Sequence, residues 1–168
     1  PLPLKAFDRE GMVLYCSSFT KSLVPDLRIG WTMPGRFREK VERLRFNVSI
    51  ANPQLGQLAI ASFLASGGYE RHLRRLRNAL KKQVSDLALA VARHFPSGTR
   101  ISAPRGGMCL WVELDSRLDA LQLFDRALEE NISILPGALC STTDRYNHCI
   151  RLNCGYPLGD EGERGIAV

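Results

Sequence analysis

The sequence predicts an α/β fold in which helices pack on a sheet, and two observations support this prediction. Over the last third of the chain, strand and helix patterns alternate, which is typical of an α/β layer. The chain has 168 residues, of which 45% are hydrophobic, so it is long enough to bury a core without a disulfide or a metal. The same composition excludes a disordered or collagen-like chain.

Two strands and a helix are predicted at the start of the chain. The runs VLYCSSF at 13–19 and LRIGWTM at 27–33 are apolar and β-prone, and a polar turn separates them. Pro34 and Gly35 end the second strand and open a helix, which is expected to end near Asn47. The basic residues of this helix fall on the face opposite its apolar positions, as expected for a helix packed on one side.

Two further helices are predicted in the middle of the chain. Residues 53–66 form a helix of small and aliphatic side chains that ends at Gly67-Gly68. A long helix is expected to follow, because the apolar residues there recur at steps of three and four, and it is expected to break at Pro96. These residues are Leu73, Leu76, Leu80, Val84, Leu87 and Val91.

The last third is predicted to contain a strand at 108–114, a helix at 118–130, and strands at 132–135 and 149–153. A final helix is expected to start at a capping box near the end of the chain.

Asp160 and Glu163 have the spacing of such a capping box, but few residues follow them. The chain also begins at Pro1 without an initiator methionine. Both features lead us to expect a fragment of a longer protein.

The five cysteines, Cys16, Cys109, Cys140, Cys149 and Cys154, show no C-x-x-C spacing and are expected to be reduced, mostly buried thiols. No histidine has a partner at metal-ligand spacing, so no metal is assigned. No segment has the length of a membrane span or the pattern of a signal peptide. We therefore expect a soluble, cytoplasmic protein without a membrane partner.

The residues around Lys21 form the sharpest candidate site. A lysine at the end of a buried strand can supply a neutral amine for a covalent bond with an aldehyde. Ser18 and Arg28 are residue types that bind phosphate, the first through a hydroxyl and the second through a bidentate guanidinium. On these residues alone, the alternative is an exposed turn lysine beside an arginine whose stem packs on Trp31.

The run SSFTKSLVPDLRIGW resembles the pyridoxal-phosphate lysine segment of fold-type I aminotransferases. It is most similar to the version in the aminotransferase-like domain of MocR-type regulators of the GntR superfamily, which typically reads S-F-S-K-T-L-x-P-G-L-R-x-G-[WY]. Thr20 replaces the second serine and keeps its hydroxyl. Asp26 replaces the glycine, and we expect strain there if the turn requires a positive φ.

The resemblance extends over almost the whole chain. It includes GQLAIASFLASGGYERHLRRLR, GGMCLWVEL at 106–114, ISILPGALCS at 132–141 and CIRLNCGYP at 149–157. The last of these implies that Arg151 binds the α-carboxylate of an amino acid. From the residues alone, the alternative is a strand arginine that pairs with a carboxylate on a neighbouring helix. Cys140 and Cys154 stand where the family often has aromatic residues.

The resemblance implies a C-terminal fragment of the fold-type I aminotransferase fold, with pyridoxal 5'-phosphate (PLP) as cofactor. The end of the large PLP-binding domain is expected at 1–46, an interdomain helix region at 47–68 and the small α/β domain at 69–168. Lys21 is implied as the catalytic residue, and the cofactor-binding residues as Ser18, Thr20, Lys21 and Arg28. The remaining cofactor contacts are expected from sequence that precedes the lysine, so the fragment alone is expected to be inactive.

Two functions follow from the resemblance. In the first, the parent protein is a homodimeric regulator that binds DNA through an N-terminal winged-helix domain, and this domain senses PLP or an amino-acid ligand. In the second, the parent is a stand-alone aminotransferase acting on an α-amino acid, in which Lys21 holds the cofactor and moves a proton. The stretch G-x-Y-x-x-H-L-R-R-x-R favours the regulator.

A third hypothesis, a nucleic-acid-binding module, depends on the basic run RHLRRLRNALKK at 71–82 and on a pI near 9.3. The leucines of this run lie on one helical face, so its charges are expected on the opposite, solvated face. No aromatic residues are interleaved to form a stacking platform. The basic run is therefore interpreted as an exposed helix.

Overall fold

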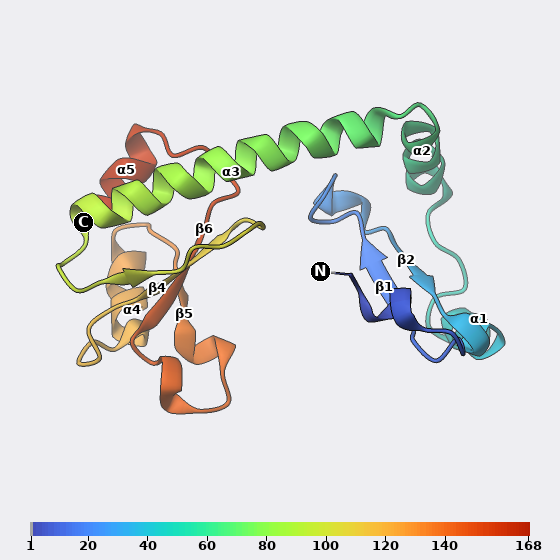
Figure 1. Ribbon diagram of the computed structural model, residues 1–168, viewed down its shortest axis with the longest axis horizontal. Helices are drawn as coiled ribbons and strands as arrows, with labels where there is room; N and C mark the ends of the chain where they lie inside the picture. Colours follow the sequence, from blue (N-terminus) through green and yellow to red (C-terminus); the bar gives the residue numbers. More distant parts are fainter. Residues whose placement is uncertain (1) are drawn as a thin grey trace. The chain divides into compact units, whose positions relative to one another are not determined.

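The computed structural model describes residues 2–168, which form two compact units. The first unit ends at Arg74 and the second begins at Arg75. This boundary falls within the long helix α3, Gly68–His94, which contributes residues to both units (Figure 1). In the described residues no helix has both the length and the apolar character to cross a membrane.

A two-stranded antiparallel hairpin organises the first unit. Strands β1, Tyr15–Ser18, and β2, Gly30–Met33, pair in a register that places Ser18 opposite Gly30. Both strands lie within the two predicted runs and are shorter than them, since a turn and the 3-10 helix η2, Pro25–Leu27, take up the residues between. Figure 1 shows the hairpin in blue.

Asp8 fixes the chain just before the hairpin, after the 3-10 helix η1, Leu4–Phe7. Its carboxylate accepts hydrogen bonds from Lys5 Nζ at 2.8 Å and from the backbone N–H groups of Met12 at 2.9 Å and Val13 at 3.0 Å. The hydrogen bond from Lys5, followed by those from the backbone, holds the pKa of Asp8 well below its ordinary value. The Asp8 side chain is only 3% exposed.

Two helices follow the hairpin in the first unit. The 3-10 turn η3, Gly35–Phe37, leads into α1, Arg38–Val48, and α2 covers Gln54–Ala65. Both helices agree with the predicted positions. Gly56 of α2 is buried, and a Cβ at this position would lie 2.8 Å from Cδ1 of Ile29, so glycine allows the helix to approach the chain before β2.

The second unit is built on a four-stranded antiparallel sheet with the order β3-β4-β6-β5. The central strands are β4, Cys109–Glu113, and β6, Cys149–Asn153, while β3, Arg100–Ile101, and β5, Leu135–Pro136, are short edge strands. The 3-10 turns η4, Gly137–Cys140, and η5, Asp144–Tyr146, precede β6. Helices α4, Ala120–Glu129, and α5, Asp160–Ala167, complete the unit together with its part of α3.

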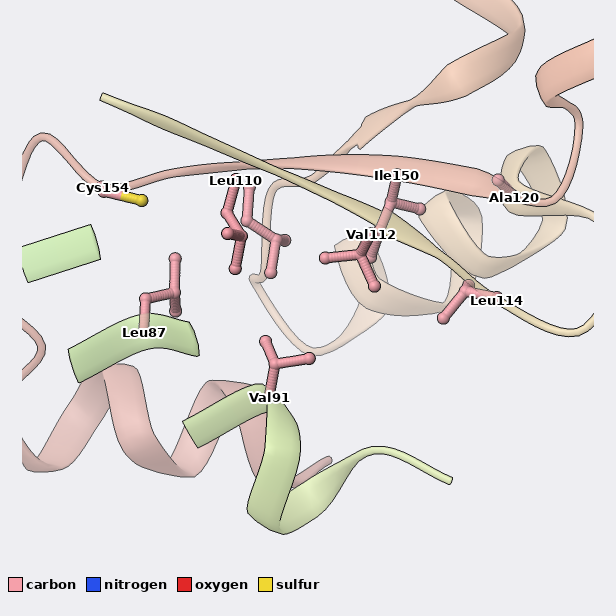
Figure 2. Packing of buried hydrophobic residues seen from close by; sticks show 9 residues of the cluster. Leu87, Val91, Leu110, Val112, Leu114, Ala120, Ile150 and Cys154 are labelled. Atoms are coloured by element: carbon pink, nitrogen blue, oxygen red, sulfur yellow. The ribbon is translucent and has the colours of Figure 1, made fainter. Parts of the chain in front are cut away.

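The core of the second unit lies on one face of this sheet. Leu110 and Val112 of β4 are opposite Leu152 and Ile150 of β6, and all four side chains are buried. Figure 2 shows Leu87 and Val91 of α3 pointing toward them. The leucine periodicity of the long predicted helix therefore corresponds to a packed helix face.

Two predicted details in the second unit are wrong. The strand expected at 132–135 is reduced to β5, because α4 ends in a turn in which Asn131 adopts a φ of 61°. The capping box of Asp160 and Glu163 does not form, since Gly159 is the N-cap and no side chain caps the helix. Instead, Glu163 accepts hydrogen bonds from Arg93 at 2.6 Å and from His94 at 2.9 Å.

The cysteines are free thiols in the part of the chain that the structure describes. Cys149 and Cys154 are buried, Cys109 is half-buried, and Cys16 and Cys140 are exposed, so the expectation of mostly buried thiols is only partly met. Burial raises the pKa of both buried thiols.

Candidate functional site

The end of the β1–β2 hairpin brings together four of the predicted site residues. Ser18 is the last residue of β1. The backbone N–H of Phe19 donates a hydrogen bond of 3.0 Å to the carbonyl of Ile29, which extends the strand pairing by one residue. Thr20 and Lys21 follow in the turn, and Arg28 immediately precedes Ile29 on the returning chain. Hairpin pairing therefore places Ser18, Thr20, Lys21 and Arg28 at one end of the hairpin.

These four side chains are accessible and polar. Ser18, Lys21 and Arg28 are exposed and Thr20 is half-buried, and in residues 2–168 none of the four side chains forms a hydrogen bond or an ion pair. The expectation that Lys21 ends a buried strand is wrong: it lies three residues beyond β1, and of that strand only Tyr15 is half-buried. A sheet of two strands has too few neighbours to cover both of its faces.

Arg28 has an unusual backbone conformation. Its φ of 48° and ψ of 39° lie in the left-handed region, and its N–H donates to the carbonyl of Pro25 at 3.3 Å. The expected strain at Asp26 is absent, because Asp26 lies within the right-handed turn of η2 and the positive φ falls two residues later. Strained residues often occur where a side chain must be held in a particular place.

The first turns of α3 contact the turn that carries Lys21. The hydroxyl groups of Tyr69 and Ser22 share a hydrogen bond of 2.9 Å, and Nε2 of His72 lies 2.9 Å from the carbonyl oxygen of Ser22. The ring of Tyr69 also packs edge-on against the ring of Phe19, with centroids 5.6 Å apart. Tyr69 and His72 are not among the predicted site residues. The signal for them in the sequence is the spacing i, i+3, which places both side chains on one helix face.

Arg151 belongs to the second unit. It lies in the middle of β6 between Trp111 of β4 and Leu135 of β5, on the sheet face opposite the core. Its side chain is exposed, and no carboxylate within residues 2–168 lies within 4.0 Å of its guanidinium, so the pairing with a helix carboxylate is absent there. On the same face, the ring of Trp111 packs edge-on against that of Tyr146 at 5.4 Å.

The three histidines lie in separate environments. His94 bonds to Glu163 at 2.9 Å, and Nε2 of His148 lies 3.5 Å from a carboxylate oxygen of Glu113. The pKa of Glu113 is lowered, mainly by its hydrogen bond from Arg100. Among the described residues, no group of three or more histidine, cysteine or acidic side chains could hold a metal ion.

The basic run of α3 has the orientation that its periodicity predicts. Its leucines, Leu73, Leu76 and Leu80, are half-buried, and its six basic side chains are exposed. One of them, Lys82, pairs with Asp86 at 2.5 Å. The basic side chains thus form a solvated helix face.

Curated relatives of the chain include transcription regulators and an aminotransferase. The chain is 38% identical over 99% of its length to the uncharacterized HTH-type transcriptional regulator YdcR of Escherichia coli, of which it covers 36%. It is 34% identical over 95% of its length to YjiR, another such regulator of the same organism, of which it covers 34%. An uncharacterized aminotransferase of Saccharolobus solfataricus is 30% identical over 99% of the chain, which covers 42% of that protein.

Solved structures of aminotransferases have the same fold. A kynurenine aminotransferase of Pyrococcus horikoshii matches 98% of the chain with a TM-score of 0.86 and 28% identity, and the chain covers 41% of it. The α-aminoadipate aminotransferase LysN of Thermus thermophilus matches 92% of the chain with a TM-score of 0.79 and 30% identity, and 39% of it is covered. No family model matches the sequence. The chain thus spans about a third to two fifths of the length of these proteins.

Proposed function

Because the chain is part of a fold-type I aminotransferase-like domain, similar to those of MocR-type regulators, we propose that it carries the lysine-bearing part of a PLP site in a transcription regulator of this kind. In this proposal the domain senses PLP or an amino-acid ligand. Helix-turn-helix DNA binding, homodimeric assembly and a cytoplasmic location belong to the same proposal and concern the full-length protein.

The observation that carries the proposal is the set of polar side chains at the end of the hairpin. Two hydroxyl groups and a guanidinium are donors suited to a phosphate, and a lysine amine is the group that reacts with an aldehyde. Because these donors have no partner within residues 2–168, they are available to a ligand. Their chemistry fits PLP, which contains both a phosphate and an aldehyde.

Each residue has a distinct role in this proposal. Arg28 binds the phosphate through its planar guanidinium, and the hydroxyl groups of Ser18 and Thr20 donate to the same group. Lys21 attaches the cofactor covalently and holds a proton at Nζ that it exchanges with a bound amino acid. When bound, PLP supplies a ring that accepts electrons from the substrate. Arg151 binds the α-carboxylate of the amino acid as a bidentate donor.

Borohydride reduction of the full-length protein with PLP, followed by peptide mass mapping, tests the covalent role. We expect the reduced pyridoxyl group on Lys21 and its absence in Lys21→Ala. The exposed lysine Lys40 provides a control, since Lys40→Ala is expected to keep the label on Lys21. Labelling of a different lysine, or of none, would refute the cofactor assignment.

Arg151 is tested separately, because its role concerns the amino acid and not the cofactor. In the full-length protein, Arg151→Ala is expected to abolish the spectral response of bound PLP to added amino acids and to leave PLP binding intact. Arg145→Ala is a matched control, since Arg145 is exposed and packs over the ring of Tyr146. An unchanged amino-acid response in Arg151→Ala would contradict the role.

A stand-alone aminotransferase is the second candidate function. It is favoured by the 30% identity to an aminotransferase of Saccharolobus solfataricus and by the TM-score of 0.86 with a kynurenine aminotransferase. The two candidates differ in turnover and in DNA binding. Sustained transamination without sequence-specific DNA binding by the full-length protein would favour the enzyme, and ligand-dependent DNA binding with little turnover would favour the regulator.

A further inference from the structure

The turn that carries Lys21 is held on both sides of the lysine by one helix end. Two residues before Lys21, the ring of Phe19 packs edge-on against Tyr69 at 5.6 Å and 77°. One residue after it, the hydroxyl of Ser22 bonds to Tyr69 and its carbonyl to His72, each at 2.9 Å. The side chain of Phe19 before Lys21, and the hydroxyl and carbonyl of Ser22 after it, therefore join the turn to α3, while the Lys21 side chain stays exposed.

The chain beside Lys21 has few other anchors. The N–H groups of Ser22 and Leu23 bond back to the carbonyl of Phe19 at 3.3 and 2.8 Å, which closes the turn on itself. Within the described residues, the contacts from Tyr69 and His72 are the side-chain hydrogen bonds that tie this turn to another element. The orientation of the turn thus depends on these two side chains.

The start of α3 is shaped to present them. Gly67 has a φ of 67°, and Gly68 is buried so closely against the ring of Phe63 that a Cβ would overlap it. These glycines let α3 begin directly after α2, and the spacing i, i+3 places Tyr69 and His72 on the same helix face. A carbonyl oxygen only accepts, so Nε2 of His72 carries the hydrogen of its bond to Ser22.

We propose that Tyr69 and His72 are positioning residues that orient Lys21 for covalent capture of an aldehyde cofactor. This inference rests on the proposed function. In the step concerned, the Lys21 amine nitrogen attacks the aldehyde carbon, a C=N bond replaces the C=O bond, and the oxygen leaves as water with the two amine protons. Tyr69 and His72 touch neither reacting group; they hold the backbone from which the amine extends.

Two probes separate positioning of the amine from general binding. PLP condenses with the lysine, whereas pyridoxamine phosphate has an amine in place of the aldehyde and binds only non-covalently. In the full-length protein we expect Tyr69→Phe to slow PLP condensation roughly 3- to 10-fold and His72→Leu by at least as much, the effect of one lost hydrogen bond each. The dissociation constant for pyridoxamine phosphate is expected to stay within about 2-fold of wild type.

Matched variants test the individual hydrogen bonds. His72→Gln retains an N–H donor and is expected to restore part of the condensation rate. Ser22→Ala removes the hydroxyl partner of Tyr69, so its combination with Tyr69→Phe is expected to be no slower than either single variant. Tyr156→Phe is the control, because Tyr156 is 86% exposed and lies outside this turn.

The outcomes separate this inference from the proposed function. If the wild-type protein forms no borohydride-reducible adduct at Lys21, the proposed function fails. If the wild type forms it and Tyr69→Phe and His72→Leu condense at the wild-type rate, the positioning role is overturned. An equal loss of PLP condensation and pyridoxamine phosphate binding, together with a lowered Tm, also overturns it, because that pattern reflects folding of the unit.

Discussion

Arg28 combines a charge suited to a phosphate with a backbone conformation that disfavours any side chain. The left-handed region costs a residue with a Cβ about 1–2 kcal/mol, and glycine avoids this cost. The positive φ and the guanidinium charge are two separate properties of this position. The strain and the charge can therefore be separated by mutation.

Replacing Arg28 by Gly or by Ala gives different expected effects on stability and the same effect on binding. Both variants lose the guanidinium, so the affinity for PLP in the full-length protein is expected to fall by about 1.5–3 kcal/mol. Only Arg28→Gly relieves the positive φ, so it is expected to be more stable than Arg28→Ala by about 1 kcal/mol. Urea unfolding without cofactor and PLP titration measure the two quantities. Unchanged PLP affinity in both variants would remove Arg28 from the phosphate site.

The carboxylate of Asp8 gives a pH dependence with a definite sign. Its pKa is lowered in the folded state from the ordinary value of 3.8. At pH values between the folded-state pKa and 3.8, the unfolded chain therefore binds more protons than the folded one. The stabilisation is fully present above about pH 5 and is lost as the pH falls through the folded pKa. The difference in Tm between wild type and Asp8→Asn is therefore expected to shrink from pH 6 to pH 3, and a constant difference would contradict this.

At the scale of elements, the predictions from sequence were good where a hydrophobic period was long and poor where a few backbone torsions decided the structure. The long periodic pattern correctly predicted α3, and the predicted strand at 108–114 contains β4. The strand at 132–135 failed because Asn131 turns the chain with a φ of 61°, which composition does not reveal. The contacts of Tyr69 and His72 were missed for a similar reason, since their partner Ser22 is about fifty residues away in the sequence.

Helix α4 offers a direct test of a local stabilising contact. The Asp119 side chain is its N-cap and accepts a hydrogen bond from the backbone N–H of Leu121 at 2.8 Å. Asp119→Ala is expected to lower the free energy of unfolding by about 1 kcal/mol. Asp125→Ala, at an exposed position of the same helix, is expected to change it by less than about 0.5 kcal/mol. Equal effects of the two variants in chemical denaturation would exclude a capping role.

At the scale of the whole molecule, the two units differ in how much apolar surface they bury. The buried cluster of the second unit joins α3, β4 and β6, whereas among residues 2–74 of the first unit the buried hydrophobic side chain is Ile60. Several large apolar side chains of the first unit are more than 60% exposed, among them Leu4, Phe7, Val48, Ile50 and Leu55. Sequence periodicity identifies apolar faces, but only the structure shows which of them are covered. The expected domain boundaries of the chain, after residues 46 and 68, remain predictions.

The 168-residue chain expressed alone is expected to bind PLP weakly and to show no aminotransferase activity. Its candidate cofactor residues lie in the unit that buries less apolar surface, and covalent attachment through one lysine is reversible without further contacts. Titration by visible absorbance measures the binding, and amide hydrogen exchange is expected to show faster exchange in β1 and β2 than in β4 and β6. A stable coloured complex at micromolar PLP would contradict this expectation.

The distribution of the thiols makes the chain suitable for spectroscopic labelling without engineered cysteines. Cys16 is exposed in the first unit and Cys140 in the second, while the buried Cys149 and Cys154 have raised pKa values that slow alkylation. A donor and an acceptor dye on Cys16 and Cys140, with Cys109 replaced by Ser, would report the distance between the units in solution. Energy transfer measured before and after addition of PLP or an amino acid would then show whether ligand binding moves one unit against the other.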